Sequence, residues 1–156
     1  DSIKAVRVRV APLVMDLCNK KDITRGLEGK YSIYHSCAVG LVRGKAGLKE
    51  YTDAAVNDTA VKSVRERVTA IADTSITEDQ ADIEVELQDG RKLVRFIEQS
   101  LGNVHRPLSD RQLEDKLRDQ CVPALSNAQV DRLIELCWKI DKLDDVAELV
   151  KATVRS

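Results

Sequence analysis

Alternating apolar and polar residues mark the strands of this chain. In residues 6–10 valine alternates with arginine, and this period of two is typical of a strand with one face in water. Ile3 and Ala5 are out of phase with the alternation, which predicts a bulge or a differently buried start. Pro12 ends this strand, and a further strand is expected at residues 68–72.

A β-hairpin is the clearest unit in the sequence. Apolar residues occupy every second position of residues 83–87, and a second β-like run covers residues 93–97. Between the two runs stands Asp89-Gly90, a pair that is typical of tight hairpin turns. The segment is therefore expected to form two adjacent antiparallel strands.

Three carboxylates, Asp82, Glu84 and Glu86, follow the alternation of the first hairpin strand. Such a row resembles a cation site, but the wet face of a strand is the simpler interpretation. On that interpretation the carboxylates face Lys92 and Arg95 across the hairpin.

The longest apolar stretch has the period of a helix. It follows Ser32 and ends at Gly44, a typical C-cap residue. Ile33, Cys37 and Leu41 share one helical face, and Ala38 and Val42 widen it, so we expect this helix to be largely buried. The residues before it, 13–30, are expected to be irregular.

Capping residues mark the other helices. Asp58 is a good N-cap for a short helix that carries Val61 and Val64. Ser109 and Gln112 form a capping box. After Gly102 the pattern is helical only, and the helices are expected at about residues 110–121, 125–140 and 142–154.

These elements predict an α+β fold in which a small mixed sheet with a hairpin and packed helices is followed by an all-helical C-terminal tail. The change in character near residue 105 is a candidate domain boundary. We therefore expect an α+β domain at residues 1–104 and a helical tail at residues 105–156.

Composition and charge exclude several classes of protein. The 156 residues are 43% hydrophobic and 33% charged, a balance typical of globular domains. The net charge of -1 and the 3% of aromatic residues argue against a nucleic-acid partner or an anionic membrane. The sequence has no long apolar run, and we expect no signal peptide among its first residues.

The four cysteines do not have the spacing of a zinc site, because no two of them form a Cys-x-x-Cys pair. We interpret them as reduced, mostly buried thiols of a cytoplasmic protein. They are Cys18, Cys37, Cys121 and Cys137.

The candidate chemistry lies at the start of the helix after Ser32. His35 falls in its first turn, where the helix dipole favours anions and a neutral imidazole. A carboxylate docked there would meet Lys30, Ser32, Tyr34 and His35, and a neutral imidazole can donate a hydrogen bond or accept a proton. The alternative is an ordinary capped helix start with a packed histidine. His105 is interpreted as a solvated loop residue.

The order of these motifs resembles the C-terminal part of the MmgE/PrpD family. Residues 30–39, followed by Gly44-x-x-Gly47, resemble a characteristic stretch of the family. That stretch consists of the motif Phe-Ser-Ile-Pro-Tyr, a helix rich in Ala and Val, and Asp-Gly. Other matching segments are residues 3–10, residues 58–68, Asp89-Gly90, and Gly102 followed by residues 107–117.

The resemblance implies proton abstraction next to a carboxylate of a small di- or tricarboxylate, without metal or organic cofactor. The family includes 2-methylcitrate dehydratases, cis-aconitate decarboxylases and an iminodisuccinate epimerase. A large helical domain supplies most of its catalytic residues, and a smaller domain, similar to chorismate mutase in topology, acts as a lid. His35 stands where the family has an active-site tyrosine, Tyr34 at its proline, and Arg43 at the usual Asp.

Two hypotheses follow. In the first, the chain is the lid and helical tail of such a lyase or isomerase, lacks an N-terminal helical domain, is inactive alone and forms homo-oligomers. We expect exposed apolar surface around Leu113, Leu117, Leu133 and Trp138 on this hypothesis. In the second, the chain is a self-sufficient α+β module that binds a carboxylate metabolite without catalysis.

Overall fold

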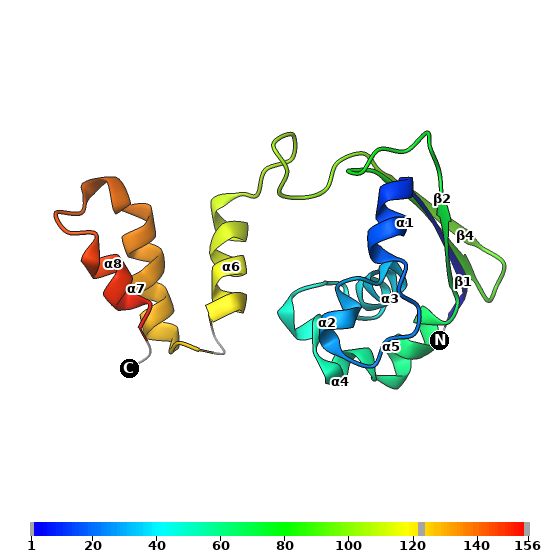
Figure 1. Ribbon diagram of the computed structural model, residues 1–156, viewed down its shortest axis with the longest axis horizontal. Coiled ribbons are helices and arrows are strands. Elements are labelled where there is room, and N and C mark those ends of the chain that lie inside the picture. The colour runs from blue at the N-terminus through cyan, green and yellow to red at the C-terminus, as the bar shows by residue number, and fades with distance from the viewer. Residues whose placement is uncertain (1, 122–123, 155–156) are drawn as a thin grey trace. The chain divides into compact units, whose positions relative to one another are not determined.

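The computed structural model describes residues 2–121 and 124–154 of the chain. It divides into two compact units, Asp1–Arg106 and Pro107–Ser156 (Figure 1). The first unit combines a sheet with helices and the second contains helices, so the α+β class predicted from the sequence is confirmed.

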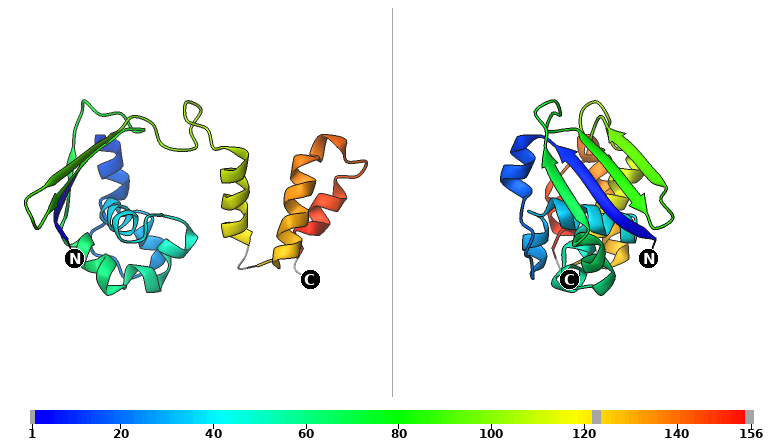
Figure 2. Two further views of the ribbon diagram at one scale, coloured as in Figure 1. Left: turned by 180° about the vertical axis from the view of Figure 1, so that it is seen from behind. Right: turned by 90° about the vertical axis from the view of Figure 1, so that its right-hand side faces the viewer.

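A four-stranded mixed sheet organises the first unit. Its strands are β1 (Ile3–Val10), β2 (Val68–Ala72), β3 (Ala81–Leu87) and β4 (Lys92–Ile97), in the spatial order β2-β1-β3-β4 (Figure 2). β2 runs parallel to β1, whereas β3 and β4 are antiparallel to their neighbours. The N-terminal strand is therefore central and paired on both sides.

The strand predictions are confirmed. The register of β1 against β3 shifts between Ile3 and Ala5, where the alternation of the sequence changes phase. The hairpin turns at Gly90, whose φ of 85° is readily available only to glycine. Its N–H donates to the carbonyl of Leu87 over 3.0 Å.

The helices of the first unit lie against one face of the sheet (Figures 1 and 2). They are α1 (Pro12–Cys18), α2 (Gly26–Gly29), α3 (Ile33–Arg43), the 3₁₀-helix η1 (Leu48–Tyr51), α4 (Asp53–Val56) and α5 (Thr59–Arg65). The core joins the valines of β1 to α3 and α5, and its helical members are Tyr34, Ala38, Val39, Val61 and Val64.

Two predictions about this part of the chain were wrong. Residues 13–30 contain α1 and α2 rather than irregular backbone. The predicted face of α3 was wrong in part: Ala38 is buried and Ile33 and Cys37 pack on the core, but Leu41 and Val42 are exposed. Tyr34 and Val39 are buried in their place. Because α3 is apolar on nearly every side, its periodicity does not identify the face that packs on the sheet.

The other face of the sheet carries a network of ion pairs. Glu84 pairs with Arg7 of β1 and Lys92 of β4, and Glu86 pairs with Lys4. The row of carboxylates is therefore the wet face of a strand, as predicted. The predicted position of Arg95 was wrong, because it lies opposite Ile83 and so belongs to the helix-bearing face.

The second unit consists of α6 (Asp110–Cys121), α7 (Asn127–Trp138), the 3₁₀-helix η2 (Ile140–Lys142) and α8 (Ala147–Ala152). The predicted capping box is present, since the N–H of Ser109 donates to Gln112 Oε1 over 2.9 Å. The last helix is shorter than predicted. Among the described residues of this unit, the buried side chains all come from α7: Val130, Leu133, Ile134 and Leu136.

The cysteines are less buried than predicted. Cys137 is exposed, and Cys18, Cys37 and Cys121 are half-buried. Burial raises the pKa of the Cys37 thiol to about 11, which keeps it protonated and unreactive at neutral pH. Among the described residues, none of the helices has the length and apolar character needed to cross a membrane.

Candidate functional site

The start of α3 is fixed by two serines. The backbone N–H of His35 donates to Ser32 Oγ over 3.2 Å, which makes Ser32 the N-cap. Ser36 Oγ donates to the Ser32 carbonyl over 3.1 Å and lies 3.0 Å from the Tyr51 hydroxyl. These bonds hold the first turn of α3 against η1 and so determine where the His35 side chain lies.

The His35 ring is sealed inside the first unit, with 0% of its surface exposed. Its Nε2 lies 2.8 Å from the carbonyl oxygen of Glu50. Because a carbonyl can only accept, Nε2 carries the proton and donates it. Tyr51 packs against the ring at a centroid distance of 5.4 Å in a T-shaped arrangement.

The second ring nitrogen of His35 has no such partner. Nδ1 is buried and has no hydrogen-bond partner among the described residues. In the tautomer fixed by Glu50 it carries a free lone pair, so it is an acceptor without a donor. A buried acceptor of this kind can take up a proton or a hydrogen bond from a ligand.

The charge state of His35 follows from the same surroundings. Burial lowers the pKa of the imidazole, the Glu50 carbonyl partly opposes this, and the positive charges of Arg65 and Arg43 lower it further. The ring is therefore neutral at pH 7.

Tyr34, the residue before His35, faces a different environment. Its side chain is 3% exposed, and its hydroxyl donates to Asn19 Oδ1 over 2.5 Å. Lys21 Nζ lies 5.1 Å from the centre of its ring, within the range of a cation–π contact. Lys30, at the end of α2, is exposed.

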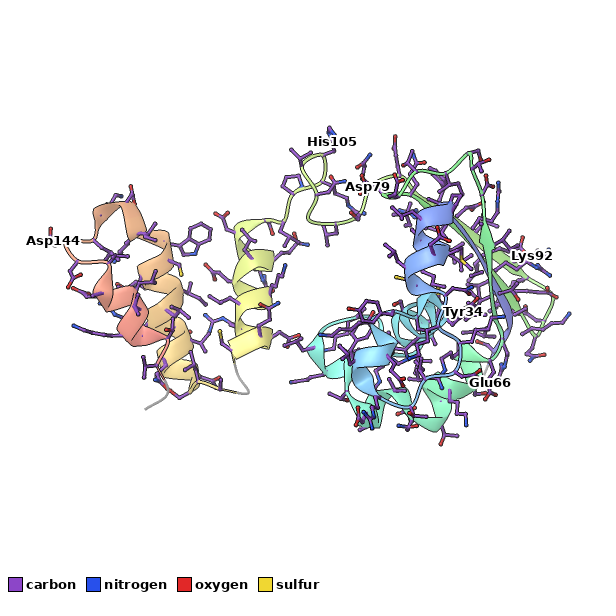
Figure 3. All side chains as sticks on the ribbon, in the orientation of Figure 1. Tyr34, Glu66, Asp79, Lys92, His105 and Asp144 are labelled. Carbon is purple, nitrogen blue, oxygen red and sulfur yellow. The ribbon has the colours of Figure 1, made fainter. Side chains whose placement is uncertain are left out.

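The structure thus joins only part of the predicted set. Ser32 and His35 are directly connected, whereas Tyr34 points toward Asn19 and Lys21, and Lys30 points into solvent. His105 is exposed on the loop after β4, as predicted (Figure 3).

Sequence reasoning missed the residues that surround His35. The backbone carbonyl of Glu50 accepts the hydrogen bond from Nε2, and the Tyr51 ring packs against the imidazole. Gly29 has no side chain, which leaves room for the imidazole. A Cβ at Gly29 would lie 2.9 Å from His35 Cδ2, so the imidazole occupies the volume that any other residue would fill. No local signal in the sequence connects these positions, because they lie on separate elements.

A pocket of about 450 Å³ beside Tyr34 was also missed. Tyr34 of α3 and Glu66 after α5 both belong to its wall (Figure 3). The available signal is the spacing of Lys62, Arg65 and Glu66, which places these charges on one side of α5 and of the C-cap residue that follows it. The wall consists of Lys21, Asp22, Ile23, Thr24, Tyr34, Lys62, Arg65, Glu66 and Val68.

Comparison with known families identifies nearly the whole chain. The family model for the MmgE/PrpD C-terminal domain matches residues 1–140. No curated protein matches the chain. The matched region contains the complete first unit, the α3 site and most of the helical unit.

Proposed function

The chain belongs to the MmgE/PrpD family, and we propose that its first unit is the lid of a cofactor-independent lyase or isomerase that acts on small di- or tricarboxylates. The observation that carries this proposal is the match of the family's C-terminal domain to residues 1–140. The activity is of the 2-methylcitrate dehydratase type: a proton leaves the carbon next to a carboxylate, a hydroxyl group leaves the neighbouring carbon, and together they form water.

We assign the proton-transfer role to Nδ1 of His35. The ring is neutral, Nε2 is occupied by the Glu50 carbonyl, and Nδ1 is an acceptor without a partner among the described residues. A general base must reach its proton directly or through one water. The ring is enclosed, so proton transfer in this proposal requires a path to Nδ1 that leaves the Glu50 carbonyl bonded to Nε2.

The other predicted residues have supporting roles in this proposal. The ammonium group of Lys30 is exposed and binds a substrate carboxylate. Ser32 orients the first turn of α3 through its N-cap bond, and Tyr34 holds the opposite side of that turn through Asn19. The proposed site uses no cofactor or metal.

In this proposal the helical unit packs on the large helical domain of the family. α6 has no fully buried residue, and an apolar depression runs between α6 and α7. Leu113 is 43% exposed and Trp138 50% exposed at its edge. Leu133 is buried, so the prediction that it belongs to the exposed surface was wrong. Homo-oligomer formation stays a prediction.

The test is deuterium exchange next to a carboxylate, followed by proton NMR. The assay uses 2-methylcitrate, cis-aconitate and iminodisuccinate with the chain joined to the family's large helical domain. Wild type is expected to exchange or convert one substrate. His35→Gln retains a donor for Glu50 but no base, and should lose about 100-fold or more in rate.

His105→Gln is the matched control, because this histidine is exposed on a loop. It should retain the wild-type rate. If His35→Gln is as active as the control, His35 has no role in proton transfer. Binding of a substrate without exchange or conversion would instead favour the module that binds carboxylates without catalysis.

A further inference from the structure

The pocket beside Tyr34 collects positive charge from two separate segments. Lys21 belongs to the loop between α1 and α2, and Lys62 and Arg65 belong to α5. Its volume of about 450 Å³ is within the range of pockets that hold small molecules. His35 does not belong to the wall of this pocket, and its ring lies against Gly29 and Tyr51.

Arg65 is the unusual member of this wall. Its side chain is only 8% exposed, whereas arginine is rarely buried without an ionic partner. One guanidinium N–H donates to the carbonyl of Val56 over 2.9 Å, and this carbonyl carries no charge. Within residues 2–121 and 124–154, no carboxylate lies within ion-pair distance of Arg65.

Two carboxylates stand on the same wall and must be weighed against the cations. Asp22 and Glu66 both raise the pKa of Arg65, but burial, the largest influence, lowers it. Both carboxylates belong to exposed residues, so solvent screens them, and neither neutralises the buried guanidinium. The wall of the pocket therefore carries three cationic side chains against two exposed carboxylates.

Lys21 and Lys62 are free to complete a site around Arg65. Both belong to exposed residues, so their ammonium groups can reorient toward a ligand. The cation–π contact with Tyr34 keeps Lys21 at the wall. An arginine fork with two mobile ammonium groups matches an anion that carries several oxygens.

From this geometry we propose that the pocket between the 21–24 loop, Tyr34 and α5 is a binding site for a small multivalent oxyanion, bearing carboxylate or phosphate groups. Its charged oxygens bind the buried Arg65 guanidinium, and Lys21 and Lys62 close over it. Because the net charge of the chain is -1, non-specific attraction of anions to the whole chain does not account for such binding. The proposal is independent of the proposed activity.

The experiment is isothermal titration calorimetry of the full chain with citrate, pyrophosphate and acetate, in a chloride buffer at constant ionic strength. Citrate or pyrophosphate should bind with a stoichiometry of one, at least about tenfold more tightly than acetate, because single charges cannot span three cations. Tighter citrate binding would assign the site to carboxylates, and tighter pyrophosphate binding would assign it to phosphates.

Matched double variants locate the site. Lys21→Gln with Lys62→Gln should weaken binding about tenfold, and Lys45→Gln with Lys116→Gln removes the same charge from exposed positions elsewhere and should not. Arg65→Lys keeps the charge but not the fork and should also weaken binding.

All four lysines belong to exposed residues, so the double variants are expected to fold, and their unfolding curves check this. The proposal is overturned if neither citrate nor pyrophosphate binds saturably. It is also overturned if the two double variants bind alike. Neither result depends on turnover, so a failed pocket and a failed lyase assignment remain distinguishable.

Discussion

At the scale of single residues, the position of His35 depends on a missing side chain. A Cβ at Gly29 would lie 2.9 Å from His35 Cδ2 and 3.2 Å from Val56 Cγ2, closer than ordinary packing allows. We predict that Gly29→Ala lowers the free energy of unfolding by about 1–3 kcal/mol, because overpacking displaces the buried ring. Urea unfolding followed by circular dichroism measures this.

Gly40 is the control for Gly29, since it also lies in a helix, but an added Cβ meets nothing within 4 Å. Gly40→Ala should be neutral or stabilising by up to about 1 kcal/mol, because alanine favours the helix. Equal destabilisation by both variants would show that the contact with His35 is not the cause.

The neutral His35 ring also makes stability depend on pH. Its folded pKa is below the ordinary value of 6.5, so below pH 6.5 the unfolded chain binds more protons than the folded chain. The free energy of unfolding therefore falls as the pH falls below 6.5. Above pH 6.5 both states hold His35 neutral, and its titration no longer changes the stability. We predict a larger loss between pH 7.5 and 5.5 for wild type than for His35→Gln, measured by urea unfolding. Identical pH dependence would contradict a depressed pKa.

The sequence identified His35 but not its burial. The first-turn position follows from Ser32 and the helical period, which are local features. The seal comes from Gly29, Glu50 and Tyr51, and their proximity depends on tertiary packing that no periodicity contains. The burial of Arg65 could not be predicted for the same reason, because a charged residue on a short helix is ordinarily assigned to solvent.

At the scale of elements, α3 depends on its first hydrogen bond. Ser32 is 1% exposed and accepts from the His35 N–H, so the cap is buried. We predict that Ser32→Ala lowers the free energy of unfolding by about 1–2 kcal/mol, because a buried N–H loses its partner. Ser32→Thr keeps an accepting hydroxyl and should lose less. Chemical denaturation compares the two, and equal losses would attribute the effect to packing instead of capping.

The elements that were predicted share strong local signals, and the missed elements do not. The hairpin combines strict alternation with Asp89-Gly90, and α5 begins at the Asp58 N-cap. α1 spans seven residues, has no side-chain cap and has no fully buried residue. It is stabilised by partial packing of Val14 and Met15 on the core, which a local pattern cannot show.

At the scale of the whole molecule, the two units differ in how much they bury. Among the described residues, the first unit has a core shared by the sheet, α3 and α5, while the second has buried side chains only on α7. Single cores of fewer than about 70 residues rarely supply more than about 3–5 kcal/mol. We therefore expect the helical unit to be the less stable part of the chain alone, as for a segment that packs on a further domain in the proposed enzyme.

Trp138 allows this difference to be measured, because it is the single tryptophan of the chain and lies on α7. Its fluorescence reports the helical unit, whereas far-UV circular dichroism reports both units. We predict that the fluorescence midpoint in urea lies below that of the last circular dichroism step. Gly29→Ala should shift only the later step, since its contacts lie in the first unit. If the two transitions coincide and move together, the two units fold cooperatively. Joining the family's helical domain should raise the urea midpoint of Trp138 fluorescence if that domain covers α6 and α7.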